Sequence, residues 1–496
     1  MEKYILAIDQ GTTSSRAILF DHEGNLVSTA QKEIENFFPQ PGWVEQSADE
    51  IYGSVAAVLT ECLAKAGLSL AEVAAIGISN QRETTIVWDS DTGKPVYFAL
   101  VWQSKQSESY CEEKRANGHE TFIKKKTGLL IDPYFSASKI RWILDHIENG
   151  QKRAEAGELL CGTVDSWLLY RLSGNKVHKT DVSNASRTLL MDIHTLSWSK
   201  ELCDIWNIPL CILPEICATS TVLAVTDATI FGMEVPIASV VGDQQAALFG
   251  QTCFKEGEVK NTYGTGCFLL MNTGSKPVFS SQGLVTSVGW KIENEVTYVL
   301  EGSVFVAGAA VQWLRDQLQI IPDAPSSEEK AKSVKDNGGV VVVPAFSGLG
   351  APYWKPNVTG GIFGLTRGSG RGEITRATLE SLAYQTNDVI LAMSRDTGFA
   401  LSSLKVDGGA CKNDLLMQWQ ADVSQTQVHR PVISETTALG AAYLAGLAVG
   451  YWKNSEEIAS RWRSEVVFEP KQSASEMKVH LERWEKAVKA AMLFGE

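Results

Sequence analysis

The stretch IDQGTTSSRAILFD, residues 8–21, sets small and polar residues between two apolar runs that predict β-strands. Glycine lets backbone N–H groups approach an anion closely, and threonine and serine hydroxyls add donors without bulk. A carboxylate, Asp9, stands directly before the turn, where it can hold Mg2+ through water or accept a proton. The stretch therefore predicts a β-hairpin that is either an ordinary loop or a phosphate cradle beside a metal ion.

A second turn of the same kind, Gly264-Thr265-Gly266, lies between two strand-like runs in the other half of the chain. Two such cradles at equivalent places can hold the two ends of a polyphosphate in a cleft between the halves. Neither turn fits the P-loop or the dinucleotide-binding glycine pattern, which argues against those folds. The recurrence of the turn favours the phosphate-binding interpretation for both.

Two further elements fit around such a polyphosphate. Asp243 follows the apolar run at residues 237–241, and a carboxylate in that position can coordinate Mg2+ through water or take a proton from an attacking hydroxyl. The turn Asp407-Gly408-Gly409 follows a predicted strand and precedes a predicted helix, so its bare backbone can lie close to a nucleotide. Each element also has a structural alternative, a helix cap for Asp243 and a simple strand–helix turn for residues 407–409.

The predicted elements follow a similar order in the two halves. The first half begins with strands at residues 4–8, 16–20 and 25–32, a helix capped by Ser47, and a strand at 74–79. The second half offers strands at 258–263, 268–271, 285–292, 295–300, 340–343 and 404–406, and helices at 303–316, 374–393 and after 412. Because 496 residues exceed a single core, we expect two domains, residues 1–245 and 246–496, consistent with an internal duplication.

Composition restricts the possible partners. The net charge of −13 and the absence of a basic run longer than residues 124–126 argue against nucleic acid and anionic membrane surfaces. The spacing of the nine cysteines matches no zinc site, so we expect free thiols in a reducing cytoplasm. The longest apolar run, residues 438–452, is too short to span a bilayer and predicts a buried helix. Two segments near the end, 477–484 and 487–494, look amphipathic.

Several longer stretches resemble one family. The two cradles and residues 407–409 resemble the phosphate and adenosine elements of the actin, Hsp70 and sugar-kinase superfamily. Within it, the chain resembles the FGGY carbohydrate kinases, and among them those that phosphorylate glycerol. The stretches that carry this resemblance are SNQRETT (79–85), VWQ (101–103), DPYFS (132–136) with Lys139, GDQQAALFG (242–250), NTYGTGCF (261–268), EGSVF (301–305) and ATLES (377–381).

The resemblance implies an α/β fold of two actin-like, ribonuclease H-like domains, each a mixed sheet flanked by helices, with a cleft between them. It implies transfer of phosphate from ATP to glycerol with Mg2+ and a homodimeric or homotetrameric assembly. Glycerol would be bound by Arg82, Glu83, Tyr134, Asp243 and Gln244, with Trp102 and Phe268 as aromatic walls. A site selective for a small polyol must bond each hydroxyl, and these side chains supply suitable donors and acceptors.

The remaining site residues follow from the same resemblance. Asp243 would be the general base, Arg16 would offset charge on the transferred phosphate, and Asp9 would position Mg2+. The expected nucleotide-binding residues are Thr12, Thr13, Ser14, Arg16, Gly264, Thr265, Gly308, Gln312, Gly409 and Asn413.

The chain departs from the pattern of the family that it resembles in a few places. Lys105 stands where an arginine fork is common, and Asn357-Val358-Thr359 replaces a different tripeptide. Residues 228–236 contain no histidine for phosphorylation, and Glu234 occupies the place of an arginine that binds fructose 1,6-bisphosphate in some relatives. We therefore expect both of those controls to be absent.

Two rival interpretations are considered. The first is a kinase for another small polyol or ketose, such as erythritol, dihydroxyacetone or xylulose. The second is an ATP-driven switch of the actin or Hsp70 type, which would not need the Arg82–Glu83 pair, Tyr134 and a second carboxylate. Dependence of ATP turnover on a polyol separates the two.

Overall fold

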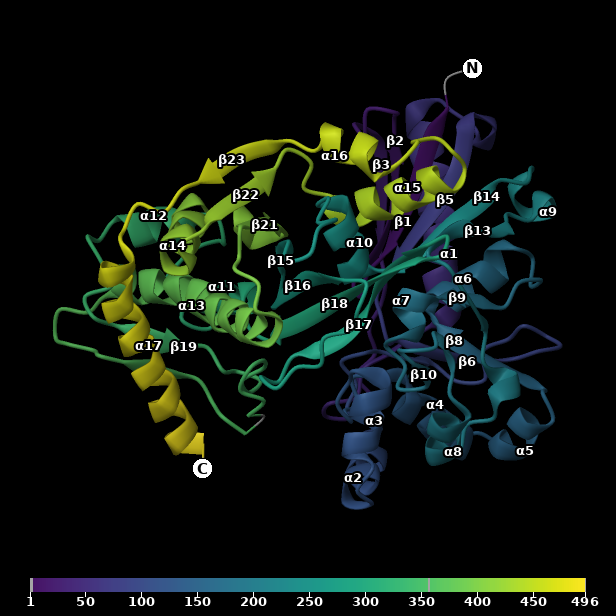
Figure 1. Ribbon diagram of the computed structural model, residues 1–496, viewed down its shortest axis with the longest axis horizontal. Helices are drawn as coiled ribbons and strands as arrows, with labels where there is room; N and C mark the ends of the chain where they lie inside the picture. Colours follow the sequence, from purple (N-terminus) through teal and green to yellow (C-terminus); the bar gives the residue numbers. More distant parts are fainter. Residues whose placement is uncertain (1–2, 356, 496) are drawn as a thin grey trace.

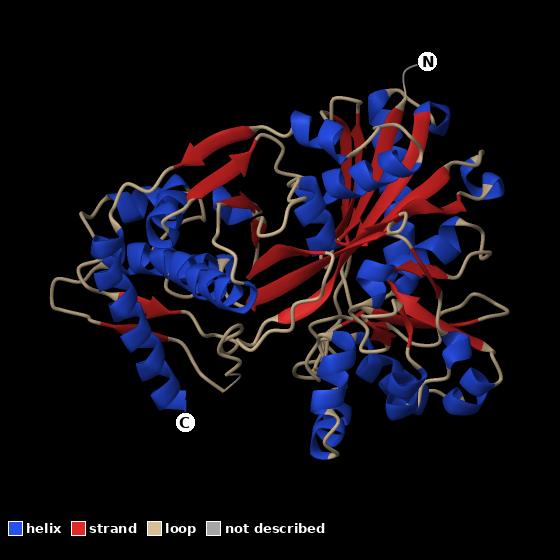
Figure 2. Cartoon of the chain, in the orientation of Figure 1, coloured by secondary structure: helices blue, strands red, loops and turns tan. Residues whose placement is uncertain are grey.

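The computed structural model describes residues 3–355 and 357–495. Strands run from one half of the molecule to the other with helices on both sides (Figures 1 and 2). The strands of the largest sheet are β1 (Tyr4–Gln10), β2 (Ser14–Phe20), β3 (Leu26–Glu33), β5 (Val73–Asn80), β13 (Ser220–Val225), β14 (Pro236–Gly242), β15 (Val259–Tyr263), β16 (Cys267–Gly274), β17 (Val285–Ile292), β18 (Glu295–Val304), β21 (Ser403–Asp407), β22 (Gln427–Pro431) and β23 (Ser464–Phe468).

Smaller sheets and helices complete the fold. A second sheet contains β4 (Glu45–Gln46), β6 (Thr85–Asp89), β7 (Ala99–Leu100) and β8 (Leu159–Thr163). Strand pairs are formed by β9 (Lys179–Asp181) with β12 (Glu215–Cys217), β10 (Met191–Asp192) with β11 (Ser197–Trp198), and β19 (Val341–Val343) with β20 (Gly361–Phe363). The helices are α1 (Ala48–Ala66), α2 (Glu108–Ala116), α3 (Glu120–Thr127), α4 (Ser136–His146), α5 (Gly150–Glu155), α6 (Val164–Leu172), α7 (Val182–Ala185), α8 (Lys200–Trp206), α9 (Ala228–Phe231), α10 (Asp243–Gly250), α11 (Gly308–Asp316), α12 (Ser326–Lys332), α13 (Arg371–Thr397), α14 (Asp414–Ser424), α15 (Thr436–Ala448), α16 (Ser455–Arg461) and α17 (Ala474–Gly495).

The two halves of the large sheet repeat one arrangement. The first half runs β3-β2-β1-β5-β14 and the second runs β18-β16-β15-β21-β22. In each half the first three strands pair antiparallel and the last two continue parallel to the central strand. The halves meet where β13 pairs with β17 at Ser220 and Ile292. The expected α/β fold with two similar mixed-sheet halves is thereby confirmed.

Helices from both ends of the chain cover the first half of the sheet. Alternate residues of β1 face opposite layers. Leu6 and Ile8 belong to the core cluster that includes α1, whereas Ile5 and Ala7 belong to the cluster that includes α15. Helix α15 therefore returns from late in the sequence to the sheet of the first half, as its yellow ribbon beside β1 and β5 indicates (Figure 1).

Helices α10 and α15 pack unusually closely. A Cβ atom on Gly440 would lie 1.9 Å from the carbonyl oxygen of Ala246, and one on Gly250 would lie 2.0 Å from that of Thr436. Only glycine fits at such backbone contacts. The expected division at residue 245 lies inside α10 and stays a prediction, and its outer limits include residues 1, 2 and 496, which lie outside the described residues.

Some sequence-based boundaries need correction. The helix expected at residues 303–316 begins only at Gly308, because Ser303 and Val304 still pair with β16. The strand expected at 340–343 pairs with β20 outside the large sheet, and the two segments near the chain end form one helix, α17. The buried helix expected at 438–452 is confirmed as α15, and all nine cysteines are free thiols. No helix within the described residues combines the length and apolarity needed to cross a membrane.

Candidate active site

The first glycine-threonine turn is a tight hairpin between β1 and β2. The Gly11 N–H donates to the Ser14 carbonyl oxygen at 2.9 Å. Thr13 is exposed at the tip. The Thr12 hydroxyl accepts a 2.8 Å hydrogen bond from Nε1 of Trp102. The turn thus exposes small hydroxyl residues, as a phosphate cradle requires, and it is tied to an aromatic residue expected in the substrate site.

Asp9 is the last but one residue of β1 and lies among charged groups. It lies opposite Arg16 in the β1–β2 register and accepts a hydrogen bond from Ser79 Oγ at 2.8 Å. Burial raises the pKa of Asp9 to about 6, and the negative charge of Asp243 adds to this shift. Arg16 itself forms an ion pair with Glu435, the residue before α15. Three carboxylates and one guanidinium therefore meet at this strand end, so carboxylate groups are in excess.

The carboxylates of this region bear on whether it could bind a metal ion. Among the residues that the structure describes, no three His, Cys, Asp or Glu side chains gather closely enough to hold a metal ion together. Mg2+ commonly binds through one or two carboxylates, with water and phosphate oxygens as the other ligands. Asp9 fits that role as a partly desolvated oxygen ligand beside the hairpin.

Four fully buried charges form the floor of the site. Arg82 and Glu83 come from the loop after β5, Arg187 follows α7, and Glu301 lies on β18 of the other half. Arg187 Nε donates to Glu83 Oε1 at 2.5 Å, and its Nη2 donates to Glu301 Oε1 at 3.2 Å. The two arginines hold the pKa of Glu301 at about 2, against the effect of burial. The cluster is internally neutral, as buried charges must be.

The hydrogen bonds of Arg82 define which donor remains for a ligand. Its Nη1 donates to Glu301 Oε2 at 2.5 Å and to Gln245 Oε1 at 3.1 Å. Its Nη2 donates to Glu301 Oε1 at 3.0 Å and to the Tyr134 hydroxyl at 3.3 Å. Of the five guanidinium N–H groups, this leaves Nε–H, which lies 3.3 Å from Asp243 Oδ1. The fork that the sequence offered to a substrate is thus engaged by Glu301.

Glu83 is held in a strained backbone conformation. Its φ angle of 61° lies in the left-handed region, which costs a non-glycine residue about 1–3 kcal/mol. Ser136 Oγ donates to its carbonyl oxygen at 3.1 Å, and Arg187 binds its carboxylate. Within the described residues no hydrogen bond reaches Glu83 Oε2. That oxygen is therefore an acceptor held in place for a ligand.

Aromatic side chains flank these polar groups. The ring centroid of Trp102 lies 5.6 Å from that of Tyr134 and 6.3 Å from that of Phe268, both edge-on. The buried Lys139 fixes the Tyr134 loop by donating to the carbonyl oxygens of residues 133–135. These contacts build two walls next to the charged floor, as expected for a small polyol with a carbon backbone.

Asp243 is the first residue of α10 and is partly exposed. Its side chain is 29% exposed, and its Oδ1 accepts the Gln244 backbone N–H at 2.8 Å. A helix N-terminus stabilises a carboxylate through the orphan N–H groups and the helix dipole. Asp243 is thus a hydrogen-bond acceptor beside Arg82 and close enough to Asp9 for the two carboxyl groups to interact electrostatically.

The second glycine-threonine turn contacts the start of α11. The Gly308 N–H donates to the Gly264 carbonyl oxygen at 2.9 Å, and a Cβ at Gly308 would lie 2.6 Å from that oxygen. Thr265 is exposed, and its carbonyl oxygen accepts the Ala307 N–H at 2.8 Å. The parallel pairing of β15 with β21 brings Asp407 opposite Thr262, next to this turn. The two glycine elements expected around a nucleotide therefore lie side by side.

Three other residues are predicted to bind the nucleotide. Gln312 is exposed on α11, one turn after Gly308, and Gly409 is exposed after β21. Asn413 caps α14 by accepting the Leu416 N–H at 2.9 Å. That cap is its structural role, and no contact joins it to the second glycine-threonine turn among the hydrogen bonds of the described residues.

Several residues of the site carry no distinct signal in the sequence. Arg187, Gln245 and Glu435 lie outside the roles that the motifs indicate, and Glu301 belongs to a motif without an assigned role. The available hint is the run TDVSNASRT (180–188), which is polar yet wholly buried in the structure. A long polar stretch without glycine or proline can thus indicate a buried hydrogen-bond network rather than a loop.

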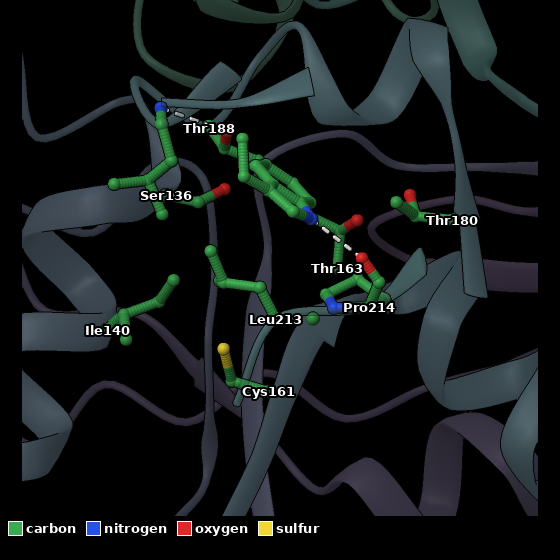
Figure 3. A pocket seen from close by; sticks show the side chains of 11 residues that line it. Ser136, Ile140, Cys161, Thr163, Thr180, Thr188, Leu213 and Pro214 are labelled. Atoms are coloured by element: carbon green, nitrogen blue, oxygen red, sulfur yellow. Dashed lines mark hydrogen bonds between the residues drawn. The ribbon is translucent and has the colours of Figure 1, made fainter. Parts of the chain in front are cut away.

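A small cavity lies behind the Tyr134 loop. Figure 3 shows hydroxyl side chains of Ser136, Thr163, Thr180 and Thr188 around it, together with Cys161. None of the predicted site residues lines this cavity. It is therefore separate from the candidate substrate site.

The two matching halves, each with a glycine-threonine turn, and the charged cluster that joins them are typical of a two-domain kinase of the actin-like class. The chain belongs to the FGGY family of carbohydrate kinases. Residues 4–250 match the N-terminal domain of that family and residues 259–449 match its C-terminal domain.

Known relatives are similar along the whole chain. The glycerol kinase of Geobacillus kaustophilus is 58% identical over 495 residues, and that of Thermus thermophilus is 57% identical over 495 residues, with full coverage of both chains in each case. The crystal structure of Plasmodium falciparum glycerol kinase with ADP superposes with a TM-score of 0.93 at 37% identity, covering 99% of this chain and 98% of that one.

Proposed function

We propose that this chain is a glycerol kinase that transfers the γ-phosphoryl group of ATP to glycerol, giving sn-glycerol 3-phosphate and ADP in glycerol catabolism. The observation that carries the proposal is the neutral, buried Arg–Glu cluster beside two phosphate hairpins. At the edge of this cluster lie groups suited to hydroxyls: Glu83 Oε2, which no hydrogen bond reaches within the described residues, and the ion pair of Arg82 Nε with the partly exposed Asp243. The names of the most similar relatives support the same substrate.

Glycerol recognition follows from hydrogen-bond satisfaction. Arg82 Nε–H donates to a hydroxyl oxygen, Glu83 accepts a hydroxyl proton, and the Tyr134 hydroxyl and the Gln244 amide reach the remaining positions. Trp102 and Phe268 cover the carbon chain. An analogue that lacks a hydroxyl leaves one of these buried groups unpaired, which is a large penalty.

The chemical step moves one proton and one phosphoryl group. Asp243 accepts the proton of the attacking glycerol hydroxyl. The oxygen of that hydroxyl bonds to the γ-phosphorus while the bond between the γ-phosphorus and the β,γ-bridging oxygen breaks. In a loose transition state this proton leaves late, so positioning and charge neutralisation dominate over base strength. Arg16 releases Glu435 to pair with the transferring phosphate.

The two hairpins hold the polyphosphate. Thr12, Thr13 and Ser14 face the γ-phosphate, and Gly264 and Thr265 face the other end. Gly308, Gln312, Gly409 and Asn413 line the nucleotide. Asp9 would hold Mg2+, and the ion would supply positive charge against the phosphates. Closure of the two halves excludes water, which otherwise competes as an acceptor.

The test is ADP release with ATP and Mg2+ in the presence of glycerol, erythritol, dihydroxyacetone or xylulose, with Asp243→Ala as the inactive control. Strong turnover with glycerol alone, lost in the variant, supports the proposal. Preference for another polyol would move the specificity within the same mechanism, and polyol-independent hydrolysis would refute it. Sedimentation velocity tests the homodimer or homotetramer implied by the family.

A further inference from the structure

Lys260 is a buried ammonium group that the reaction scheme above does not use. It lies on β15, is fully buried, and donates to Gln244 Oε1 at 2.5 Å and to Thr262 Oγ1 at 2.8 Å. No ion pair among the described residues includes it. An ammonium buried without a carboxylate partner is costly, so its presence beside the catalytic base needs a reason.

The contact with Gln244 determines how that amide is oriented. An ammonium group only donates, so Gln244 must turn its oxygen toward Lys260 and its NH2 group away from it. The NH2 nitrogen then lies 3.4 Å from Asp243 Oδ2. Without a donor-only partner, either amide orientation would be open. The chain from Lys260 through Gln244 to Asp243 thus has one consistent direction of donation.

We infer that Lys260 is a positioning residue for the phosphoryl transfer. It locks the Gln244 amide so that this side chain donates toward the base Asp243 and toward the substrate hydroxyl. The inference rests on the proposed role of Asp243. The other charges that face Lys260 come from four elements: Asp407 on β21, Asp243 on α10, Arg82 after β5 and Glu301 on β18.

The charge of Lys260 depends on pH in the working range. Burial lowers its pKa to about 8, against the attraction of Asp407 and Asp243. Above that pH the neutral amine can also accept a hydrogen bond, so Gln244 is free to turn around. The turnover number should therefore fall as pH rises through about 8.

A second buried lysine titrates in the same range but acts elsewhere. The pKa of Lys139 is also lowered to about 8 by burial, and its contacts are the carbonyl oxygens of residues 133–135 around Tyr134. Deprotonation of Lys139 loosens the loop of Tyr134, a residue proposed to bind glycerol, and so affects KM for glycerol. The readout specific to Lys260 is kcat at saturating glycerol.

The experiment compares the wild-type enzyme with Lys260→Met, Lys260→Arg and Thr262→Val between pH 6 and 9.5. Lys260→Met should lower kcat on the order of tenfold at pH 7, as loss of a charged donor predicts, with an unchanged KM for ATP and no alkaline decline. Lys260→Arg, which stays charged, should restore part of kcat and also lack the decline. Thr262→Val removes the second hydrogen-bond acceptor of Lys260 and should keep both the wild-type kcat and its decline at alkaline pH.

The inference would be overturned if Lys260→Met had the same kcat as the wild-type enzyme, or if its kcat still declined at alkaline pH. Should that variant fail to fold, the wild-type enzyme still decides, since a kcat that stays constant through pH 9 contradicts the inference. Absence of glycerol-dependent ADP release from the wild-type enzyme would refute the proposed function and this inference together. Normal turnover with an unaffected Lys260→Met variant would refute this inference alone.

Discussion

Glu301→Gln tests whether the buried charge cluster positions the substrate ligands. The substitution keeps the size of the side chain and one acceptor but removes a negative charge. It also turns an NH2 group toward an arginine, because the carboxylate receives Arg82 Nη1 at 2.5 Å, Arg82 Nη2 at 3.0 Å and Arg187 Nη2 at 3.2 Å. One oxygen cannot satisfy all three donors, so Arg82 is released from its fixed position.

The contacts set the size of the effect. Breaking a buried ion pair by removing one partner costs about 3–5 kcal/mol of stability. A charge-assisted hydrogen bond contributes about 1.5–3 kcal/mol, so loss of one such bond in the glycerol complex lowers kcat/KM for glycerol by about 10- to 100-fold. KM for ATP should change little, because the cluster lies under the polyol pocket rather than at the hairpins.

Glu380→Gln is the matched control. Glu380 is equally buried and binds Arg376 Nε at 2.9 Å and Asn337 Nδ2 at 2.6 Å, but it lies on α13 away from the pocket. Both variants should unfold at a lower denaturant concentration than the wild type, and only Glu301→Gln should have a lower kcat/KM for glycerol. Equal kcat/KM for glycerol in the wild type and Glu301→Gln, with the expected loss of stability, would refute the positioning role of the cluster.

Three further predictions concern single contacts. Asp9→Asn should abolish most Mg2+-dependent turnover but raise the free energy of unfolding by about 1–3 kcal/mol at pH 7.5. Burial raises the pKa of Asp9 from 3.8 to about 6, so the folded wild-type protein loses stability as pH rises through 6 and the carboxyl group ionises. Thermal melting at pH 4 should therefore show no gain in stability for the variant. Trp102→Phe and Thr12→Val each remove the same 2.8 Å hydrogen bond and should each lower kcat about 2- to 10-fold. Because the contact is shared, the double variant should lower kcat no more than one single variant does, and a decrease equal to the product of the two single effects would contradict this. Lys139→Met leaves three carbonyl oxygens around Tyr134 without their donor and should raise KM for glycerol about tenfold with KM for ATP unchanged, which initial-rate kinetics would measure.

The parts of the site that lie next to each other in the sequence could be predicted from it. The hairpin around Gly11 and the turn at Gly264 reveal themselves because an anion-binding turn needs small residues at consecutive positions. Strand β1 and its neighbours follow from short apolar runs separated by tight turns, and the helix capped by Ser47 from local hydrogen bonding. These features depend on neighbouring residues only.

The charge cluster could not be predicted because it depends on distant pairing. Arg82 and Glu301 are 219 residues apart, and their contact exists only because the two halves of the sheet meet. Sequence reasoning assigned the Arg82 fork to substrate, since nothing local identifies the carboxylate that fills it. The helix expected at Ser303 failed for a related reason: pairing with β16 overrides the local preference.

The cluster also explains why a neutral substrate suits this site. The charges of Arg82, Arg187, Glu83 and Glu301 cancel, and Asp243 adds a partly exposed negative charge at the edge. A substrate carboxylate would approach Glu83 and Asp243 with one free N–H from Arg82 to compensate, and an uncompensated buried charge is strongly unfavourable. A polyol meets the same donors and acceptors without that penalty. In the proposed mechanism, positive charge for the phosphate comes instead from Arg16, so polyol and phosphate would be recognised by separate groups and Asp243 would act on both.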